Sequence, residues 1–137
     1  MAAIQTIVLI DDDTDLGQLV KSNLSAHFDL KYFEEPVKAM PYLRNNLVAA
    51  VILDYYLKNT NGLLVAWELI EAFPLTPILL VSSDNSVKDK IAEMRFRHVD
   101  FLEKPFQSRD LMTSLVKILR ISNSGDIRPD EYRAVDI

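Results

Sequence analysis

Short apolar runs alternate with segments of helical periodicity along most of this 137-residue chain. Because parallel strands need long crossover connections, usually helices, this alternation favours a parallel sheet with helices on both faces. The sequence therefore predicts an α/β protein. The apolar runs predict strands at Ile4–Ile10, Phe28–Phe33, Leu47–Leu53, Pro77–Val81 and Val99–Leu102.

The pattern within each segment refines this prediction. Leu16, Val20 and Leu24 recur at helical spacing after the first run, and a last helix is expected over residues 108–120. The runs "LVAAVIL" and "PILLV" are continuously apolar, which is typical of central strands covered on both faces, whereas "FDLKYF" alternates as an edge strand does. Five strands and five helices fit a flavodoxin-like doubly wound (βα)5 domain with strand order 2-1-3-4-5.

The predicted domain covers residues 1–121, and the polar residues 122–137 are predicted to form a C-terminal tail or linker. A single domain is the expectation for a chain of this length. Within the domain, Pro41 lies inside the helix that begins near Pro36 and removes a backbone hydrogen bond to the preceding turn. That helix is therefore expected to be short, kinked or mobile.

Composition narrows the class of protein. The net charge of -5 argues against broad binding to nucleic acid, because phosphate neutralisation needs a clustered excess of lysine and arginine. Cysteine is absent, which excludes a disulfide framework and fits a reducing compartment. No basic and apolar leader precedes Ile4, and no apolar run approaches the length of a membrane span. We expect a soluble, cytoplasmic protein that binds neither nucleic acid nor membranes directly.

Polar side chains follow four of the predicted strands. Asp11 and Asp12 follow the first strand, Asp54 the third, Ser82 the fourth and Lys104 the fifth. Taken alone, an aspartate after a strand is usually a turn residue or a helix cap. Open α/β sheets, however, bind ligands at this rim, where the strand order reverses between the first and third strands. The set therefore predicts a functional site at the carboxyl ends of the strands.

The chemistry of these side chains favours a divalent cation. Asp11, Asp12 and Asp54 would repel one another unless protons or a cation relieved the repulsion. Oxygen ligands at an open site suit Mg²⁺, which commonly bridges to substrate phosphate. Lys104 adds a positive charge and Ser82 a hydroxyl, so the set would neutralise a transferring phosphoryl group. One carboxylate would then be the nucleophile and form an acyl phosphate.

Four segments that carry these residues resemble motifs of the receiver domain of bacterial two-component response regulators. "VLIDDD" resembles the acidic pair of the family's first strand, and "VILDYYLKNTNG" resembles its phosphoacceptor segment, with Gly62 at the usual offset behind Asp54. "ILLVSSD" places Ser82 at the family's hydroxyl position, and "DFLEKPF" resembles its lysine–proline pair. The resemblance runs from about Ile4 to Arg120, with near-standard spacing between the motifs.

The resemblance implies a metal site and a phosphoacceptor. Asp54 would accept the phosphoryl group. Mg²⁺ would be bound by Asp12, Asp54 and the backbone carbonyl of Tyr56, with Asp11 acting mostly through water. The phosphoryl donor would be a sensor histidine kinase or a histidine phosphotransfer protein. Such a domain catalyses its own phosphoryl transfer and autodephosphorylation but is not a conventional turnover enzyme.

The resemblance also implies a switch. Lys104 and Ser82 would contact the phosphoryl oxygens on Asp54. Ser82 would move toward the phosphate, and the ring of Phe101 would turn inward behind it. This movement would alter the outer face formed by the last two helices and the last strand, a face that would also serve homodimerisation. The Lys104–Pro105 peptide would be cis, as in relatives.

Some positions differ from the common pattern of the family. Arg97 and His98 replace a frequent Gly-Ala pair, so the helix before them loses an expected left-handed glycine cap. Tyr56 and Asp84 would flank the path of a hydrolytic water. The bulky Tyr56 is therefore expected to shield the acyl phosphate and slow its hydrolysis.

Two other functions compete with this one. A haloacid-dehalogenase-like phosphatase also uses an aspartate after the first strand with Mg²⁺, but its D-x-D-x-T pattern starting at Asp11 would need threonine or valine where this chain has Asp15. The stronger alternative is a receiver-like protein-binding module that works without phosphorylation. The intact set of acidic, hydroxyl and lysine residues argues against that module.

Overall fold

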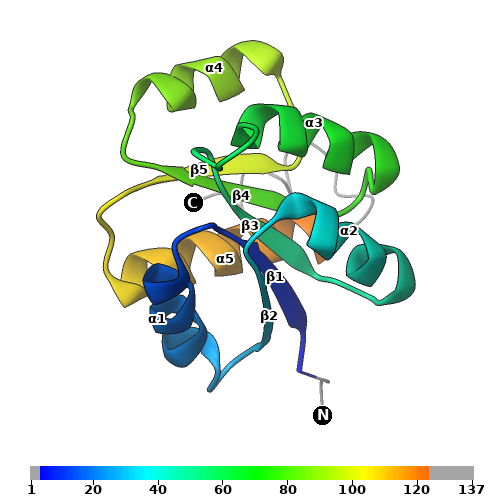
Figure 1. The fold of residues 1–137 in the computed structure, drawn as a ribbon, viewed down its shortest axis with the longest axis vertical. Helices are drawn as coiled ribbons and strands as arrows, with labels where there is room; N and C mark the ends of the chain where they lie inside the picture. Colours follow the sequence, from blue (N-terminus) through cyan, green and yellow to red (C-terminus); the bar gives the residue numbers. More distant parts are fainter. Residues whose placement is uncertain (1–3, 124–137) are drawn as a thin grey trace.

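The computed structural model of the chain describes residues 4–123 and contains one parallel sheet (Figure 1). Its strands are β1 (Thr6–Ile10), β2 (Asp29–Phe33), β3 (Ala50–Asp54), β4 (Ile78–Ser82) and β5 (Val99–Glu103). They lie in the order β2-β1-β3-β4-β5. This order confirms the predicted flavodoxin-like doubly wound fold, with the alternating strand β2 at one edge.

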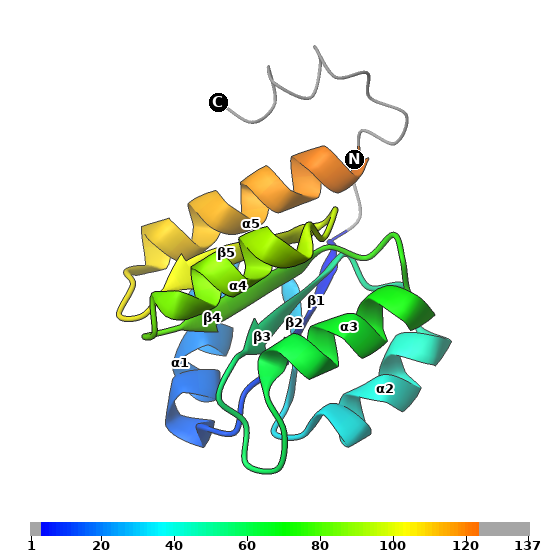
Figure 2. The same cartoon turned by 90° about the horizontal axis from the view of Figure 1, so that it is seen from above.

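Helices cover both faces of the sheet (Figure 2). They are α1 (Thr14–Leu24), α2 (Pro36–Asn45), α3 (Gly62–Ala72), α4 (Ser86–Met94) and α5 (Ser108–Asn123). Helices α1 and α5 pack on one face, and α2, α3 and α4 pack on the other. In the part of the chain that the structure describes, no helix is long and apolar enough to cross a membrane. From residue 124 on, the predicted tail lies outside the described residues.

Successive residues of each central strand point to opposite faces of the sheet. In β1, Ile7 and Leu9 belong to the core beneath α1 and α5, whereas Val8 and Ile10 belong to the core on the other face. Every residue of β3 and β4 is buried. Burial on both faces explains why these two strands read as continuous apolar runs. In β3 and β4 the polar side chains are Asp54 and Ser82, the last residue of each strand, where the site forms.

Two strands begin two or three residues later than the apolar pattern indicated. The strand predicted from Leu47 starts at Ala50, and the strand predicted from Ile4 starts at Thr6. Leu47 is 96% exposed, so this apolar residue is not part of the core. The sheet hydrogen bonds begin nearby, where the Ala49 amide donates to the Thr6 carbonyl at 2.8 Å. An apolar run therefore located these strands but not their first residues.

Helix α2 continues through its internal proline. Pro36 occupies the first turn, where its missing N–H costs nothing, and the helix runs on past Pro41 to Asn45. At its end, the side-chain amide of Asn46 donates to the Tyr42 carbonyl at 3.0 Å. This contact satisfies one of the carbonyls that the last turn of a helix leaves unpaired.

Helix α4 ends in a left-handed residue, although the sequence provides no glycine for it. Arg95 adopts φ 53° and ψ 39° and caps the helix. A non-glycine residue in this region costs about 1 kcal/mol. The glycine cap that the sequence lacks is thus replaced by an arginine in the same conformation.

Gly62 lets α3 start directly against the end of β3. A Cβ atom at position 62 would lie 2.7 Å from the Asp54 carbonyl oxygen and 2.7 Å from the Tyr55 Cα. The Gly62 amide also donates to the Tyr55 carbonyl. Because both neighbours are backbone atoms, a side chain here would displace the strand end that carries Asp54.

We predict that Gly62→Ala lowers the free energy of unfolding by about 1–3 kcal/mol, since the backbone must move to admit the methyl group. Urea denaturation followed by circular dichroism measures the change. Glu68→Ala, at an exposed position of the same helix, is the control and should stay within about 0.5 kcal/mol of the parent. Equal stability of Gly62→Ala and the parent would contradict the close approach.

Candidate functional site

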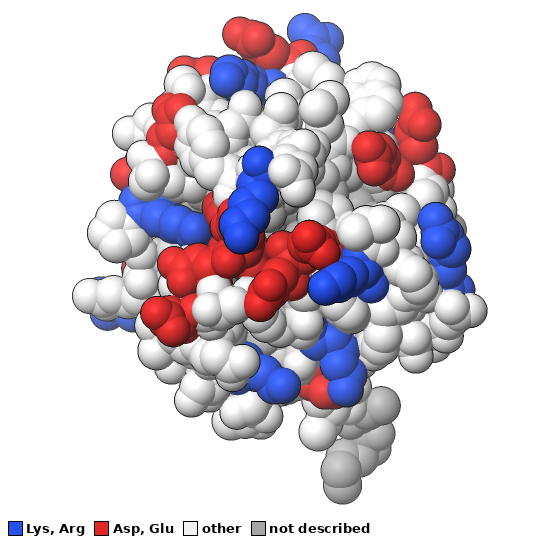
Figure 3. All heavy atoms as spheres, in the orientation of Figure 1, with Lys and Arg blue, Asp and Glu red and all other residues white. Residues whose placement is uncertain are grey.

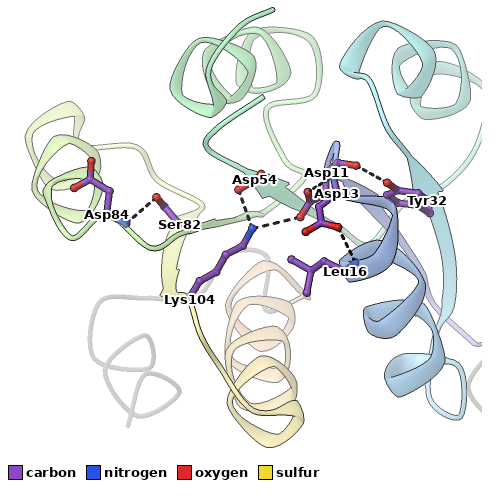
Figure 4. Close-up of polar contacts among 8 residues, drawn as sticks. All are labelled: Asp11, Asp13, Leu16, Tyr32, Asp54, Ser82, Asp84 and Lys104. Atoms are coloured by element: carbon purple, nitrogen blue, oxygen red, sulfur yellow. Dashed lines mark hydrogen bonds and ion pairs between the residues drawn. The ribbon is translucent and has the colours of Figure 1, made fainter. Parts of the chain in front are cut away.

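The sheet brings four of the predicted site residues to one rim, the edge formed by the carboxyl ends of the strands: Asp11, Asp54, Ser82 and Lys104 (Figure 4). Strands β1 and β3 are paired in the register that joins Ile10 to Leu53. Asp11 directly follows Ile10, and Asp54 directly follows Leu53, so these two aspartates emerge side by side. Lys104 follows β5 and reaches back to both of them.

Asp11, Asp12 and Asp54 form the acidic cluster, with one carboxylate oxygen from each residue lying within 4.8 Å of the others. Asp11 is 1% exposed and Asp54 is 6% exposed, while Asp12 is half-buried. The Lys104 Nζ lies 3.1 Å from Asp54 Oδ1 and 3.5 Å from Asp11 Oδ2. Figure 3 shows acidic side chains gathered in the middle of this face, with basic side chains beside them. The Lys104 ammonium group thus contacts two of the three carboxylates.

Burial makes ionisation of the cluster costly. Burial is the main cause that raises the pKa of Asp11 above its ordinary value. Burial, and then the charge of Asp11, raise the pKa of Asp54 to about 6, although Lys104 opposes the shift. The carboxylates therefore carry unfavourable charge at neutral pH that a bound cation would relieve.

Hydrogen bonds fix the loop that follows β1. The Asp13 amide donates to Asp11 Oδ1 at 2.9 Å, and Asp13 Oδ1 accepts the Leu16 amide at 3.1 Å, which caps α1. The Tyr32 hydroxyl donates to the Asp11 carbonyl oxygen at 2.6 Å. Burial and nearby acidic groups raise the pKa of Tyr32 to about 12, so the hydroxyl remains a donor at neutral pH.

Sequence reasoning missed Tyr32. Strand β2 ends without an obvious catalytic group, so it gave no signal of the usual kind. The available signal was the tyrosine near the end of an edge strand, in "DLKYF". Its contact with Asp11 depends on the register between β1 and β2, which pairs Leu9 with Tyr32. That register is visible only in the folded structure.

Ser82 is buried and turned toward the loop that leads to α4. Its Oγ accepts the Asp84 amide at 3.0 Å, and Figure 4 shows the two residues side by side. Asp84 Oδ1 accepts both the amide and the hydroxyl of Ser86, at 2.9 Å and 2.7 Å. Asp84 Oδ2 accepts the Tyr56 hydroxyl at 2.7 Å. One side chain thus ties the Ser82 loop to the loop after Asp54.

The remaining predicted residues lie around this centre. Tyr56 is 54% exposed and forms an antiparallel bridge with Asn61 that closes the loop between β3 and α3. Phe101 is half-buried and packs against the core on the α4 side of the sheet. The Lys104–Pro105 peptide is cis, as the sequence led us to expect.

Two cavities flank the acidic cluster. One of about 600 Å³ lies between the start of α2 and the loop after β3, and Asp12 lines it. The other, of about 820 Å³, lies between α1 and the segment that joins β5 to α5, and Lys104 lines it. The rim is therefore open on both sides of the cluster.

The sequence matches a known family. A family model described as the response regulator receiver domain matches residues 7–116. The chain belongs to this family. Its acidic cluster, buried hydroxyl and lysine therefore lie in a receiver domain of a two-component system.

Relatives with similar sequences are themselves response regulators. The chain is 29% identical over 125 residues to the response regulator MprA of Mycobacterium sp. (strain KMS), covering 90% of this chain and 54% of that protein. It is 24% identical to a putative NtrX-like response regulator of Rickettsia conorii, covering 85% of this chain and 25% of that protein. The chain thus spans about half of the first relative and a quarter of the second.

Solved structures agree with the fold. A response regulator receiver protein from Sinorhizobium medicae superposes with a TM-score of 0.76 at 27% identity, covering 87% of this chain and 97% of that one. A CheY-like receiver domain from Methanospirillum hungatei gives a TM-score of 0.80 at 16% identity, covering 89% and 98%. At the lower identity, the likeness supports the fold alone.

The raised pKa of Asp54 predicts that Asp54→Asn stabilises the metal-free protein. The pKa is about 6 in the folded chain against an ordinary value of 3.8. The cost of ionising Asp54 is therefore absent below about pH 3.8, grows between the two values and is complete above about pH 6. In EDTA near pH 7.5, Asp54→Asn should raise the free energy of unfolding by about 1–3 kcal/mol.

Thermal unfolding at several pH values measures this effect. The gain should fade as the pH drops toward about 4, where Asp54 is protonated in both the folded and the unfolded chain. Asp15→Asn, at an exposed position of α1, is the control and should change stability little at any of these pH values. A gain that is absent near pH 7.5, or that is undiminished near pH 4, would contradict the cost assigned to the buried charge.

Proposed function

We propose that this receiver domain accepts a phosphoryl group on Asp54 from a sensor histidine kinase or a histidine phosphotransfer protein, in a reaction that depends on Mg²⁺. The observation that carries the proposal is the acidic cluster with Lys104 bonded to Asp54 at 3.1 Å. A buried carboxylate that is fixed by a lysine and crowded by two other acids is suited to act as a nucleophile once a cation is bound. The domain would act in the cytoplasm.

The donor set fits Mg²⁺. Asp11, Asp12 and Asp54 would hold the ion, together with the backbone carbonyl of Tyr56. All of these ligands are oxygens, and one ammonium does not balance the charge of the three carboxylates. When bound, the cation stabilises the charge that develops on the phosphoryl oxygens during transfer.

The transfer itself would use Asp54 as the nucleophile. A carboxylate oxygen of Asp54 would form the new bond to phosphorus while the bond between phosphorus and the donor's imidazole nitrogen breaks, and the imidazole would leave with the bonding electrons. Because the pKa of Asp54 is about 6, the carboxylate is ionised at neutral pH and needs no separate base. Lys104 already contacts Asp54 Oδ1 and would shift to a phosphoryl oxygen as charge moves there.

Phosphorylation would then act as a switch. It adds up to about two negative charges next to Ser82, whose Oγ accepts the Asp84 amide in this structure. The Ser82 hydroxyl would turn to donate to the phosphate, which would free the Asp84 amide at the start of α4. The half-buried Phe101 of β5 would follow by turning further inward. The α4–β5–α5 face, made of these three elements, would change shape as a result.

The α4–β5–α5 face is also the surface that we propose for homodimerisation. On this face, the Lys117 Nζ of α5 lies 3.9 Å from Asp100 Oδ2 of β5. Residues 1–121 would form the receiver domain and residues 122–137 a tail or linker. Since the curated relatives are longer than this chain, the output that this face controls would belong to another segment or to a partner.

We predict that Asp54→Asn abolishes phosphorylation. Incubated with Mg²⁺ and a small-molecule phosphodonor such as acetyl phosphate, the parent protein should gain one phosphoryl group, because Asp54 is the nucleophile. Intact-protein mass spectrometry detects the added mass. The matched control is Asp15→Asn, which removes an exposed acid outside the cluster and should be phosphorylated like the parent.

The outcomes separate the proposed function from its alternative. Phosphorylation that needs both Mg²⁺ and Asp54 supports the switch. A parent protein that stays unmodified under these conditions would favour a receiver-like binding module that works without phosphorylation. Equal phosphorylation of Asp54→Asn and the parent would show that the acceptor is another residue.

We also predict that Tyr56 lengthens the life of the phosphorylated state. Its hydroxyl is bonded to Asp84 at 2.7 Å, so the two side chains form a bridge between the loops on either side of Asp54. Tyr56→Asn removes the ring and should speed loss of the phosphoryl group about fivefold or more, which is a barrier change of about 1 kcal/mol. Timed mass spectra after removal of the phosphodonor give the rate.

Tyr56→Phe separates the two contributions of this residue. It keeps the bulk of the ring and loses only the hydrogen bond to Asp84, so its rate should lie between those of the parent and Tyr56→Asn. An unchanged or slower decay in Tyr56→Asn would reject the shielding role.

A further inference from the structure

Tyr32 contacts the backbone of the acidic cluster from the edge strand of the sheet. Its hydroxyl donates to the Asp11 carbonyl oxygen at 2.6 Å (Figure 4). That carbonyl belongs to the peptide that joins Asp11 to Asp12. We propose that Tyr32, seated against Gly17, is a positioning residue that fixes this peptide and thereby sets the cation affinity of the acidic cluster. The proposal rests on the function proposed above.

The peptide between Asp11 and Asp12 decides whether the carboxylates converge. On its N-terminal side, Asp11 is held by its amide, which donates to the Phe33 carbonyl at 3.1 Å, and by its carboxylate, which accepts the Asp13 amide. On the other side, Tyr32 holds the carbonyl. The Cα of Asp12 is attached to this same peptide plane, so a rotation of the plane would carry the Asp12 carboxylate away from Asp11 and Asp54. With the plane as it stands, one oxygen from each of the three carboxylates lies within 4.8 Å of the others.

Gly17 provides the space that the tyrosine ring occupies. Gly17 is buried within α1, and a Cβ atom there would lie 2.6 Å from both Cε1 and Cζ of Tyr32. Real Cβ atoms do not approach other atoms so closely, so any larger residue would push the ring and its hydroxyl away from Asp11. Glycine inside a helix is less favourable than alanine. The glycine is explained by the ring of Tyr32, which occupies the space that a side chain would need. Gly17 and Tyr32 therefore depend on each other and form one unit.

The first test compares Tyr32→Phe with the parent protein. Loss of the hydroxyl should weaken Mg²⁺ binding about three- to tenfold, the effect of one hydrogen bond. Isothermal titration with MgCl₂ gives Kd, and thermal unfolding in EDTA monitors the fold separately. A merely structural tyrosine would change the unfolding curve and leave Kd alone. Tyr42→Phe, which alters a tyrosine on α2 away from the cluster, is the matched control and should bind Mg²⁺ like the parent.

A double-mutant cycle with Gly17→Ala tests the seating of the ring. Beside Tyr32, Gly17→Ala should weaken Mg²⁺ binding about as much as Tyr32→Phe does and should lower the unfolding temperature. In a Tyr32→Leu background, which has no ring, the same change should leave Kd unaltered and raise the unfolding temperature, because alanine favours the helix. The effect of Gly17→Ala on the unfolding temperature thus changes sign when the ring is removed, and this change is specific to the Gly17–Tyr32 contact.

The outcomes distinguish the two proposals. A parent-like Kd in Tyr32→Phe, with the parent binding Mg²⁺, would overturn the positioning role and leave the proposed function intact. Additive effects of Gly17→Ala and Tyr32→Leu would overturn the unit formed by the two residues. A parent protein that takes up no Mg²⁺ would overturn both the proposed function and the positioning role.

Discussion

Repulsion among buried carboxylates is the constraint on which the rest of this structure depends. Asp11 and Asp54 are almost fully buried, and Asp12 brings a third carboxylate to within 4.8 Å of them. Lys104 offsets part of the charge, yet the pKa of both buried acids stays above the ordinary value. Such an arrangement persists only if the strands that carry it are stable for other reasons. The continuous apolar cores on both faces of the sheet provide that stability.

The two sides of the cluster are held differently. On the β1 side, hydrogen bonds from Asp13 and Tyr32 fix Asp11 by its carboxylate and its carbonyl. On the β4 side, the Ser82 Oγ accepts the Asp84 amide. Phosphorylation would replace this hydrogen bond, because the Ser82 hydroxyl would turn to donate to the phosphate. One side would therefore maintain the geometry for binding, and the other would change on phosphorylation. Asp84 Oδ1 also accepts the amide of Ser86, the first residue of α4, so a change at Ser82 would pass to the α4–β5–α5 face through this loop.

The sequence predicted the fold and the members of the cluster because both follow from short-range patterns. Continuous apolar runs report burial on both faces, and charged residues directly after those runs must emerge at the rim. The missed features depend on how distant segments meet. Leu47 is apolar yet exposed, Arg95 adopts a left-handed conformation with no glycine to signal it, and the contact of Tyr32 needs the register between two strands. No local pattern encodes any of these.

This difference suggests where receiver domains of one family diverge. The groups that would react are few, and their positions follow from strand ends that the core fixes. The residues that hold those groups come from less constrained places, such as the edge strand with Tyr32 and the loops with Tyr56 and Asp84. A substitution in these places leaves the core packing intact and still alters how tightly the cluster is held. Cation affinity and the lifetime of the phosphorylated state would then vary between relatives whose reactive residues are identical.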